Sequence, residues 1–233
     1  MSTDILQERF FEILIAGNRP EARVLVQQQL DRGASAKQLI TDLFWPTYET
    51  LERLHRADQL SKLSHHLATR LLRVLVDQNA ARLAAEPSRG RRILALCGPA
   101  DADELGAQMA VDLLEQAGYT VSFGGGGIAN DEILQRVHED QPHVLLMFAS
   151  APSDLPCIRE LIDHIREINA APDLQIVVGG GVFNRAEGLA EEIGADVWAR
   201  HPLELVDAIT NQPYRRAELE QRTVGRKRKL KAA

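Results

Sequence analysis

Aromatic side chains and cysteines are scarce in this sequence of 233 residues. Aromatic residues make up 5% of the chain, against 45% for hydrophobic residues as a whole. A core built mainly from Leu, Val, Ile and Ala favours helix-rich or α/β packing over a β-sandwich with aromatic pairs. The two cysteines, Cys97 and Cys157, stand in or beside apolar runs, which favours buried thiols in a reducing compartment over a disulfide framework.

Long hydrophobic runs are also lacking. No run approaches the roughly 18 residues that a membrane-spanning helix requires. The first ten residues, MSTDILQERF, have neither the basic start nor the apolar centre of a secretory signal. We therefore expect a cytoplasmic protein without a membrane partner.

The net charge of −6 is distributed unevenly. The segment from Tyr214 to the end contains eight basic and two acidic residues, so it carries +6 and the rest of the chain carries −12. A nucleic-acid-binding body normally has a basic surface. The sequence therefore predicts no nucleic-acid partner, except through the basic tail, whose alternative interpretation is a solvated chain end.

The first ninety residues show no clear strand signal. Apolar residues at helical spacing, separated by Gly, Pro and Ser, predict four helices, at about residues 5–14, 20–32, 36–57 and 61–84. Ser35 is placed to cap the third helix, and Pro46, which has no N–H, is expected to bend it. Four helices with short connections predict an antiparallel four-helix bundle over residues 1–86.

Residues 86–90 read as a linker, and the pattern then changes to short apolar runs that alternate with helical stretches. Five strands are expected, at residues 92–96, 120–123, 143–148, 174–178 and 196–199. This alternation predicts an α/β domain over residues 91–212, with a flavodoxin-like five-stranded parallel sheet in the order 2-1-3-4-5. Residues 213–233 would then form a basic tail.

In that strand order the carboxyl ends of the first, third and fourth strands lie along one edge, where a ligand is expected. The loops at this edge are rich in small residues, which let a ligand approach the backbone, and in helix starts, which offer free N–H groups. The candidate ligand-binding residues in these loops are Asp101, Asp103, Gly106, Ser150, Gly179 and Gly180.

These residues resemble the pattern of the cobalamin-binding domain family, which is Asp-any-His-any-any-Gly, then Ser-any-Leu, then Gly-Gly. Asp101 and Gly106 match the ends of the first element, and Ser150 follows Gly106 after 43 residues. The Gly-Gly pair follows Pro152 after 26 residues. The helical bundle is similar to the cap of methionine synthase, corrinoid methyl carriers and cobalamin photoreceptors. The resemblance covers about residues 5–212 and implies a corrinoid in a cleft framed by the cap and the α/β domain.

The sequence departs from that pattern at two positions. The family's His, which coordinates cobalt from below, is Asp103 here, and the Leu of Ser-any-Leu is Pro152. A carboxylate is a poorer ligand than imidazole for this metal. The resemblance therefore predicts that the usual coordination from below is missing.

Three histidines stand at the cap positions where the photoreceptor branch has a Trp, followed ten and eleven residues later by Glu-His. Here these positions hold His55, His65 and His66, so the final His is retained. In that branch this His can bind cobalt from above. The resemblance implies that His66 is the metal contact and that His55 and His65 line the cofactor site.

Plainer interpretations remain open for several of these residues. Asp101, Asp103 and Glu104 can cap a helix and complement its dipole rather than bind a ligand. The run 124–127, four glycines at an edge strand, favours a flexible loop over a ligand loop. The histidines can form a solvated turn or helix-start cluster. Ser150 lacks the Gly-any-Ser-any-Gly setting of a nucleophile.

Three functional hypotheses follow. The first is a non-enzymatic cobalamin-binding sensor, similar to light-responsive antirepressors, that acts through a protein partner such as a transcriptional repressor. The second is a corrinoid methyl carrier of a methyltransferase system. The third is a degenerate interaction module, or a protein whose histidines bind haem or a divalent metal. Association with a second copy of the chain is compatible with each of them.

Overall fold

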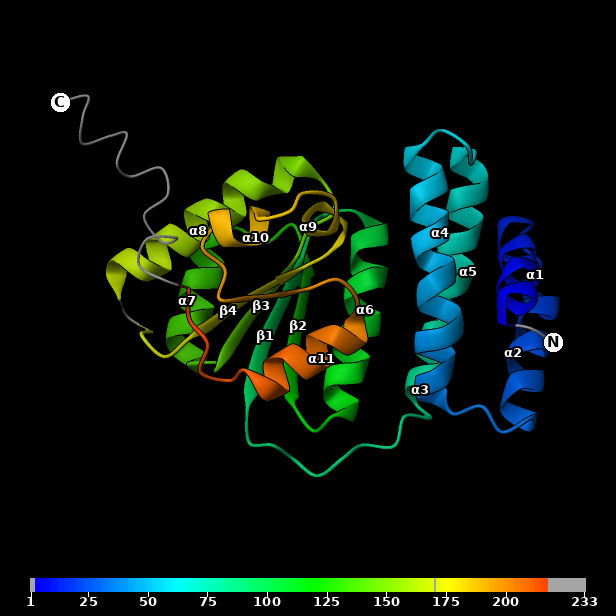
Figure 1. Ribbon diagram of the computed structural model, residues 1–233, viewed down its shortest axis with the longest axis horizontal. Coiled ribbons are helices and arrows are strands. Elements are labelled where there is room, and N and C mark those ends of the chain that lie inside the picture. The colour runs from blue at the N-terminus through cyan, green and yellow to red at the C-terminus, as the bar shows by residue number, and fades with distance from the viewer. Residues whose placement is uncertain (1–2, 170, 218–233) are drawn as a thin grey trace. The chain divides into compact units, whose positions relative to one another are not determined.

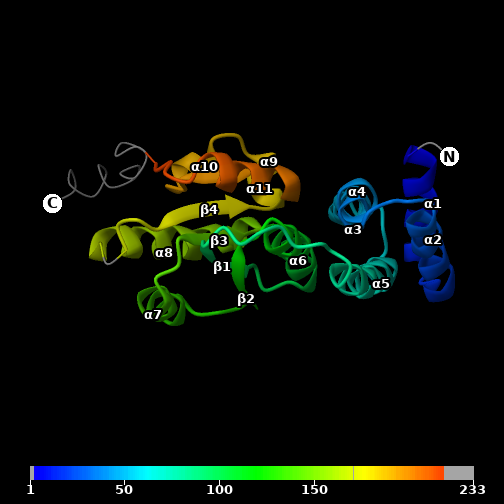
Figure 2. The ribbon, with the colours of Figure 1, turned by 90° about the horizontal axis from the view of Figure 1, so that it is seen from below.

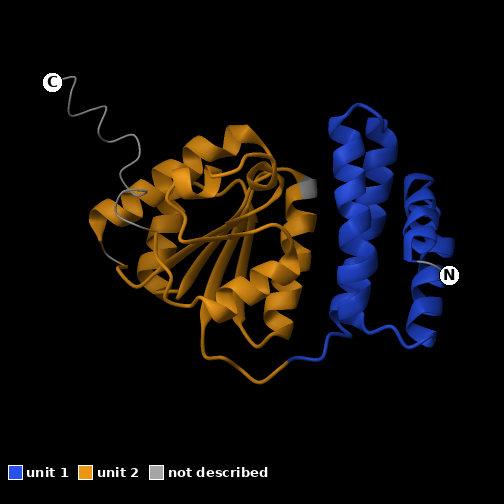
Figure 3. Ribbon diagram, viewed as in Figure 1, with its two compact units in different colours: residues 1–85 blue, residues 86–233 orange. Residues whose placement is uncertain are grey.

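The computed structural model describes residues 3–169 and 171–217, apart from the side chains of Asp101 and Ala102. Its contacts divide the chain into two compact units, residues 1–85 and residues 86–233 (Figure 3). The described helices of the first unit all precede the first strand of the second. The predicted fold class, a helical region followed by an α/β domain, is confirmed.

Side chains cap several of the helix starts in the helical unit. Its elements are α1 (Thr3–Ile15), α2 (Arg19–Asp31), α3 (Ala36–Gln38), the π-helical segment η1 (Leu39–Phe44), α4 (Trp45–Arg56) and α5 (Lys62–Ala80) (Figure 1). The Asn18 side chain caps α2, and Ser61 caps α5. Ser35 forms a reciprocal capping box with Gln38, as the sequence predicts.

The third predicted helix is continuous from α3 to α4, but its irregularity lies before Pro46 rather than at it. Residues 39–44 widen into the π-helical segment, in which the Trp45 N–H donates to the Ile40 carbonyl. Pro46 has no N–H to offer the Asp42 carbonyl. That carbonyl instead accepts a hydrogen bond from Gln7 Nε2 at 2.8 Å, so a side chain of α1 satisfies it.

The core of the helical unit brings the first helix onto the π-helical segment. Phe10 and Phe44 are fully buried, and their rings stack with centroids 5.8 Å apart. Leu14, Leu51 and Leu72 are fully buried as well. Burial of a Leu or Phe side chain contributes about 2 kcal/mol, so this unit has an apolar core of its own.

The second unit is a five-stranded parallel sheet in the order β2-β1-β3-β4-β5. Its strands are β1 (Arg92–Cys97), β2 (Thr120–Gly126), β3 (Val144–Phe148), β4 (Gln175–Gly179) and β5 (Val197–Ala199). Its helices are α6 (Asp101–Gln116), α7 (Asn130–Asp140), η2 (Pro152–Asp154), α8 (Leu155–Ile168), α9 (Gly181–Arg185), α10 (Leu189–Glu192) and α11 (Pro202–Asn211). The predicted strand order is confirmed.

Helices cover both faces of this sheet. Figure 2 shows α6 and α11 on one face and α7 and α8 on the other. The second face buries alternate strand residues, among them Leu145, Met147, Ile176 and Val178. The intervening strand residues are also buried, which explains why the strands read as continuous apolar runs.

The glycine run at 124–127 is not the loop that the sequence suggests, because β2 continues through Gly126. The pairing of β2 with β1 shifts register between Ala95 and Leu96, which accommodates the extra length. A Cβ on Gly126 would lie closer to the Gly98 carbonyl oxygen than real Cβ atoms come. The glycine therefore allows the end of β2 to pack against the loop after β1.

The cysteine prediction is wrong for one of the two residues. Neither cysteine forms a disulfide; Cys97 is half-buried and Cys157 is exposed. Cys157 lies in the first turn of α8, and the residues of this helix that are buried come later, from Leu161 to Ile165. Within the part of the chain that the structure describes, no helix is long and apolar enough to cross a membrane.

A buried carboxylate joins the last strands to the segment that follows α11. Asp196 is 3% exposed, and its Oδ2 accepts a hydrogen bond from the Ile176 N–H at 2.7 Å. Its Oδ1 accepts from Arg166 Nη2 and from the Ala217 N–H, both at 2.7 Å. Residues up to Ala217 are therefore tied to the sheet unit.

We expect Asp196→Ala to destabilise the sheet unit by about 3 kcal/mol, because it leaves two buried N–H donors and a guanidinium without their acceptor. Urea-induced unfolding measures the change. The matched control is Asp163→Ala, which removes a more exposed ion pair with Arg159 and should cost less than about 0.5 kcal/mol. Equal losses in the two variants would contradict this role for Asp196.

Candidate functional site

The candidate site is the carboxyl edge of the sheet, where β1, β3 and β4 end at the same level. Cys97 pairs with Phe148, and Phe148 pairs with Gly179. The loops that follow these strands therefore start side by side. The structure thus brings the loop of Gly98, the loop of Ser150 and the Gly179–Gly180 pair to one edge.

Backbone hydrogen bonds continue past the strands and hold the three loops together. The Gly98 N–H donates to the Phe148 carbonyl, and the Ala149 N–H donates to the Gly179 carbonyl, each at 3.0 Å. The Val182 N–H, at the start of α9, donates to the Ala149 carbonyl at 3.3 Å. The loops at this edge are consequently fixed by backbone contacts rather than by long side chains.

Gly180 is required by this packing for two independent reasons. Its φ of 103° is in the region that side chains rarely adopt. A Cβ at this position would also overlap the backbone of Ala149, including its carbonyl oxygen. Gly180 therefore lets the end of β4 lie directly against the end of β3.

Two carboxylates converge over Gly98. Asp103, in the first turn of α6, is 6% exposed, and its Oδ2 lies 2.5 Å from the point that a Cβ on Gly98 would occupy. Asp154 Oδ2 lies 3.0 Å from the same point and accepts a hydrogen bond from the Ala151 N–H at 3.3 Å. Helix α6 starts after Ala100, which has no side chain able to cap it.

The remaining residues predicted for this edge lie close by. Gly106 is buried in α6, one turn after Asp103. Asp101 is the first residue of α6, but its side chain lies outside the described part of the chain. Ser150 is half-buried, and its carbonyl accepts a hydrogen bond from Arg185 Nη2 at 2.6 Å. Among the described residues its hydroxyl has no hydrogen-bond partner.

Sequence reasoning missed Asp154 and Arg185. In the sequence, Asp154 is visible only as an acidic residue just before α8, and Arg185 only as the last residue of α9, after the glycines 179–181. Neither signal indicates which loop the side chain meets. Arg185 reaches the β3 loop, and Asp154 turns back to the residue after Ser150.

The three histidines lie in the helical unit, but they do not converge. His65 is buried, and its Nε2 lies 2.6 Å from Glu52 Oε1. His55 stacks on it, with ring centroids 3.9 Å apart and planes within 14°. His66 is exposed, with its ring centred 6.1 Å from that of His65 and tilted by 57°.

This arrangement does not fit a metal shared by the histidines. Imidazole binds metals through nitrogen lone pairs in the ring plane, and parallel stacked rings direct those lone pairs side by side rather than at one point. No group of three or more His, Cys, Asp or Glu able to hold a metal ion is found among the described residues. The structure brings His55 and His65 together and leaves His66 apart.

We expect Gly180→Ala to destabilise the sheet unit by about 2 kcal/mol more than Gly188→Ala. Both glycines have positive φ, but a Cβ on Gly188 would meet nothing within 4 Å. The difference between the variants therefore reports the clash with Ala149 together with the greater backbone strain at Gly180. Its ψ of 169° places it in a region that essentially only glycine adopts, whereas Gly188 has a left-handed helical conformation. Urea unfolding provides the measurement, and similar stabilities for the two variants would show that the loops are not tightly packed.

Comparisons with known proteins point to one cofactor. A B12 binding domain model matches residues 91–207, and a second B12 binding domain model matches residues 6–78. The monomethylamine corrinoid protein of Methanosarcina barkeri aligns with a TM-score of 0.70 at 15% identity, over 90% of this chain and 99% of that chain. No curated protein matches.

Two further solved structures align with lower scores. One is a cobalamin-binding protein from Desulfitobacterium hafniense DCB-2, with a TM-score of 0.48 and 16% identity over 88% of this chain and 97% of that chain. The other is the methanol:cobalamin methyltransferase complex MtaBC from Methanosarcina barkeri, with a TM-score of 0.49 and 15% identity over 94% of this chain and 83% of that chain.

At these identities the structural similarity establishes the fold alone. The family models carry the assignment: one spans the sheet unit with its carboxyl edge, and the other spans most of the helical unit. The resemblance predicted from the sequence is thereby confirmed at the level of the family. The chain belongs to the B12 binding domain family, and the cofactor that this membership implies is cobalamin.

Proposed function

We propose that this chain is a corrinoid carrier, which binds cobalamin and passes a methyl group between partner proteins. One observation carries the proposal: the helical unit and the sheet unit each match a B12 binding domain model, and the chain aligns with 99% of the length of a monomethylamine corrinoid protein. The sequence alone favours a regulator and ranks the carrier second. The comparisons favour the carrier.

The residues at the carboxyl edge fit the periphery of a corrinoid. A corrin ring is flat and carries amide side chains, which need donors and acceptors at its rim. Glycines at 98, 179 and 180 let the loops of this edge pack closely on one another, so the edge consists largely of backbone groups and small side chains, and the Ser150 hydroxyl is available for a hydrogen bond. We assign Asp101, Gly106, Ser150, Gly179 and Gly180 to holding the cofactor. When bound, its cobalt supplies the atom that accepts and releases the methyl group.

Asp103 distinguishes this site from the pattern that it resembles. The buried carboxylate, with Asp154 beside it, stands where the family pattern has a cobalt-binding His. Because the residue is an aspartate, the edge supplies no imidazole at that position. A carboxylate is a poorer ligand for cobalt than an imidazole. We therefore propose that any imidazole ligand comes from the helical unit. His65 is held by Glu52 and His55, which leaves the exposed His66 as the candidate.

A light-responsive regulator is the second candidate function. The specific observation in its favour is the accessible His66, together with a carboxylate in place of the lower imidazole. Such a protein would bind adenosylcobalamin and act on a partner such as a transcriptional repressor. The carrier also requires a protein partner, so the existence of a partner does not separate the two functions, whereas a response to light does.

For a carrier we expect the chain loaded with adenosylcobalamin in the dark to keep the same mass in solution after illumination. Gel filtration with light scattering, before and after green light, measures this, and the chain loaded with hydroxocobalamin is the control. A light-dependent change in mass would contradict the carrier and support the regulator. Failure to retain any corrinoid through gel filtration would refute both.

We expect His66→Ala to change the absorption spectrum of bound hydroxocobalamin, because it removes the proposed imidazole ligand. The matched control is His138→Ala, which removes an exposed histidine of α7 and should leave the spectrum as it is. A spectrum that is the same in wild type and His66→Ala, at equal corrinoid content, would exclude His66 as a ligand.

A further inference from the structure

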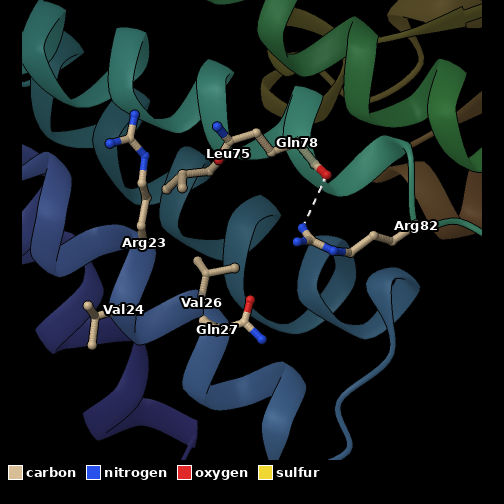
Figure 4. Close-up of a pocket in the computed structure, with 7 residues that line it drawn as sticks. All are labelled: Arg23, Val24, Val26, Gln27, Leu75, Gln78 and Arg82. Carbon is tan, nitrogen blue, oxygen red and sulfur yellow. Dashed lines mark hydrogen bonds between the residues drawn. The ribbon is translucent and has the colours of Figure 1, made fainter.

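A shallow pocket of about 360 Å³ lies on the helical unit between α2 and α5, and none of its lining residues belongs to the proposed cofactor site (Figure 4). Its apolar floor includes Val26 and Leu75, which are both buried. Val24, at its margin, is 54% exposed. Arg23 of α2 and Arg82, just beyond the end of α5, stand at its rim. The pocket thus combines an apolar floor with two cationic side chains.

The positive charge at this rim is not neutralised within the described part of the chain. None of the residues that line the pocket is acidic. Arg23 has no ion pair or hydrogen bond to another described residue. Arg82 donates to the Gln78 carbonyl at 3.2 Å, which is a neutral acceptor on α5. An occupant that is both apolar and acidic would therefore be complementary to the pocket.

The outward face of α1 has this complementary character. Asp4, Glu8 and Glu12 are all exposed, and their spacing of four residues places them on one side of the helix. Among the described residues none of these three carboxylates takes part in an ion pair. Ile5 on the same face is 54% exposed, and Phe11 and Ile15 are half-buried. This face is amphipathic and acidic.

The α1 face cannot occupy the pocket of its own chain. Helix α1 packs within its unit through Phe10, Ile13 and Leu14, which are buried on its opposite side. Its acidic face therefore points away from the core that it helps to form. In a second copy, however, the two surfaces could meet, and because both belong to the same unit, a two-fold axis would make the contact twice and close the assembly.

We propose that two copies of this chain associate through their helical units, with the acidic face of α1 in each copy seated in the α2–α5 pocket of the other. Arg23 and Arg82 meet the carboxylates of α1, while Val24 and Ile5 are removed from water. Charge complementarity sets the pairing, and the apolar side chains supply the burial. The proposal is independent of the cofactor and of the methyl-carrier function.

Analytical ultracentrifugation of the full chain tests this association. The wild type is expected to be a dimer that weakens as salt is raised. Arg23→Glu with Arg82→Glu should weaken it roughly tenfold or more, and Glu8→Arg with Glu12→Arg should do the same, because each pair creates like-charge contacts. The four changes combined should restore the affinity to near that of wild type. Circular dichroism checks the fold of each variant.

Glu132→Arg, an exposed charge reversal on α7 of the other unit, is the matched control and should leave the dimer unchanged. A wild type that stays monomeric at every attainable concentration would overturn the proposal. So would a dimer that resists both pairs of reversals, or one that the combined exchange fails to restore. If a variant does not fold, the dissociation constant of the wild-type dimer at low and high salt is the test, and a dimer that does not weaken as salt is raised would overturn the proposal.

Discussion

The close contact of backbone with backbone at the carboxyl edge of the sheet is the constraint on which the rest of the site depends. Gly180 has a positive φ and lies against Ala149, and Gly126 lies against Gly98. A side chain at Gly180 would separate the ends of β3 and β4, and one at Gly126 would separate the end of β2 from the loop after β1. Because the loops that follow β1, β3 and β4 are fixed by the strands below them, the edge presents a surface of backbone groups and small side chains, which is what a flat macrocycle with amide substituents requires.

The chemistry of the site follows from which side chains stand above that surface. Asp103 and Asp154 bring two carboxyl groups over Gly98, so the edge offers carboxyl oxygens at the position where the family pattern offers an imidazole. The imidazoles are in the helical unit, and they are unequal. His65 is committed to Glu52 and stacks on His55, whereas His66 is exposed. We therefore propose that the sheet unit binds the corrinoid and that His66 is the ligand of its cobalt.

Much of the fold could be predicted from the sequence, because short apolar runs alternating with helical stretches allow few topologies. The helix starts at Ser35 and Ser61 could also be predicted, since each serine side chain accepts a hydrogen bond from a backbone N–H in the first turn of its own helix. The end of β2 could not be predicted, because a run of glycines carries no strand signal. The strand continues there because Gly126 packs against the Gly98 carbonyl, which is distant in the sequence. The π-helical segment was hidden for the same reason: Gln7, from another helix, satisfies the Asp42 carbonyl. The positions of Asp154, Arg185 and the stacked histidines also depend on such distant contacts.

Hydrogen–deuterium exchange of the full chain, with and without hydroxocobalamin, tests most directly the claim that the corrinoid binds at this edge. We expect slower exchange on binding in three segments, residues 97–106, 148–154 and 179–185, because these contain the backbone groups that the cofactor would cover. Segments at the opposite edge of the sheet, such as residues 141–143, should exchange as before. If all three segments exchange at an unchanged rate while cobalamin is bound, the corrinoid does not bind at this edge.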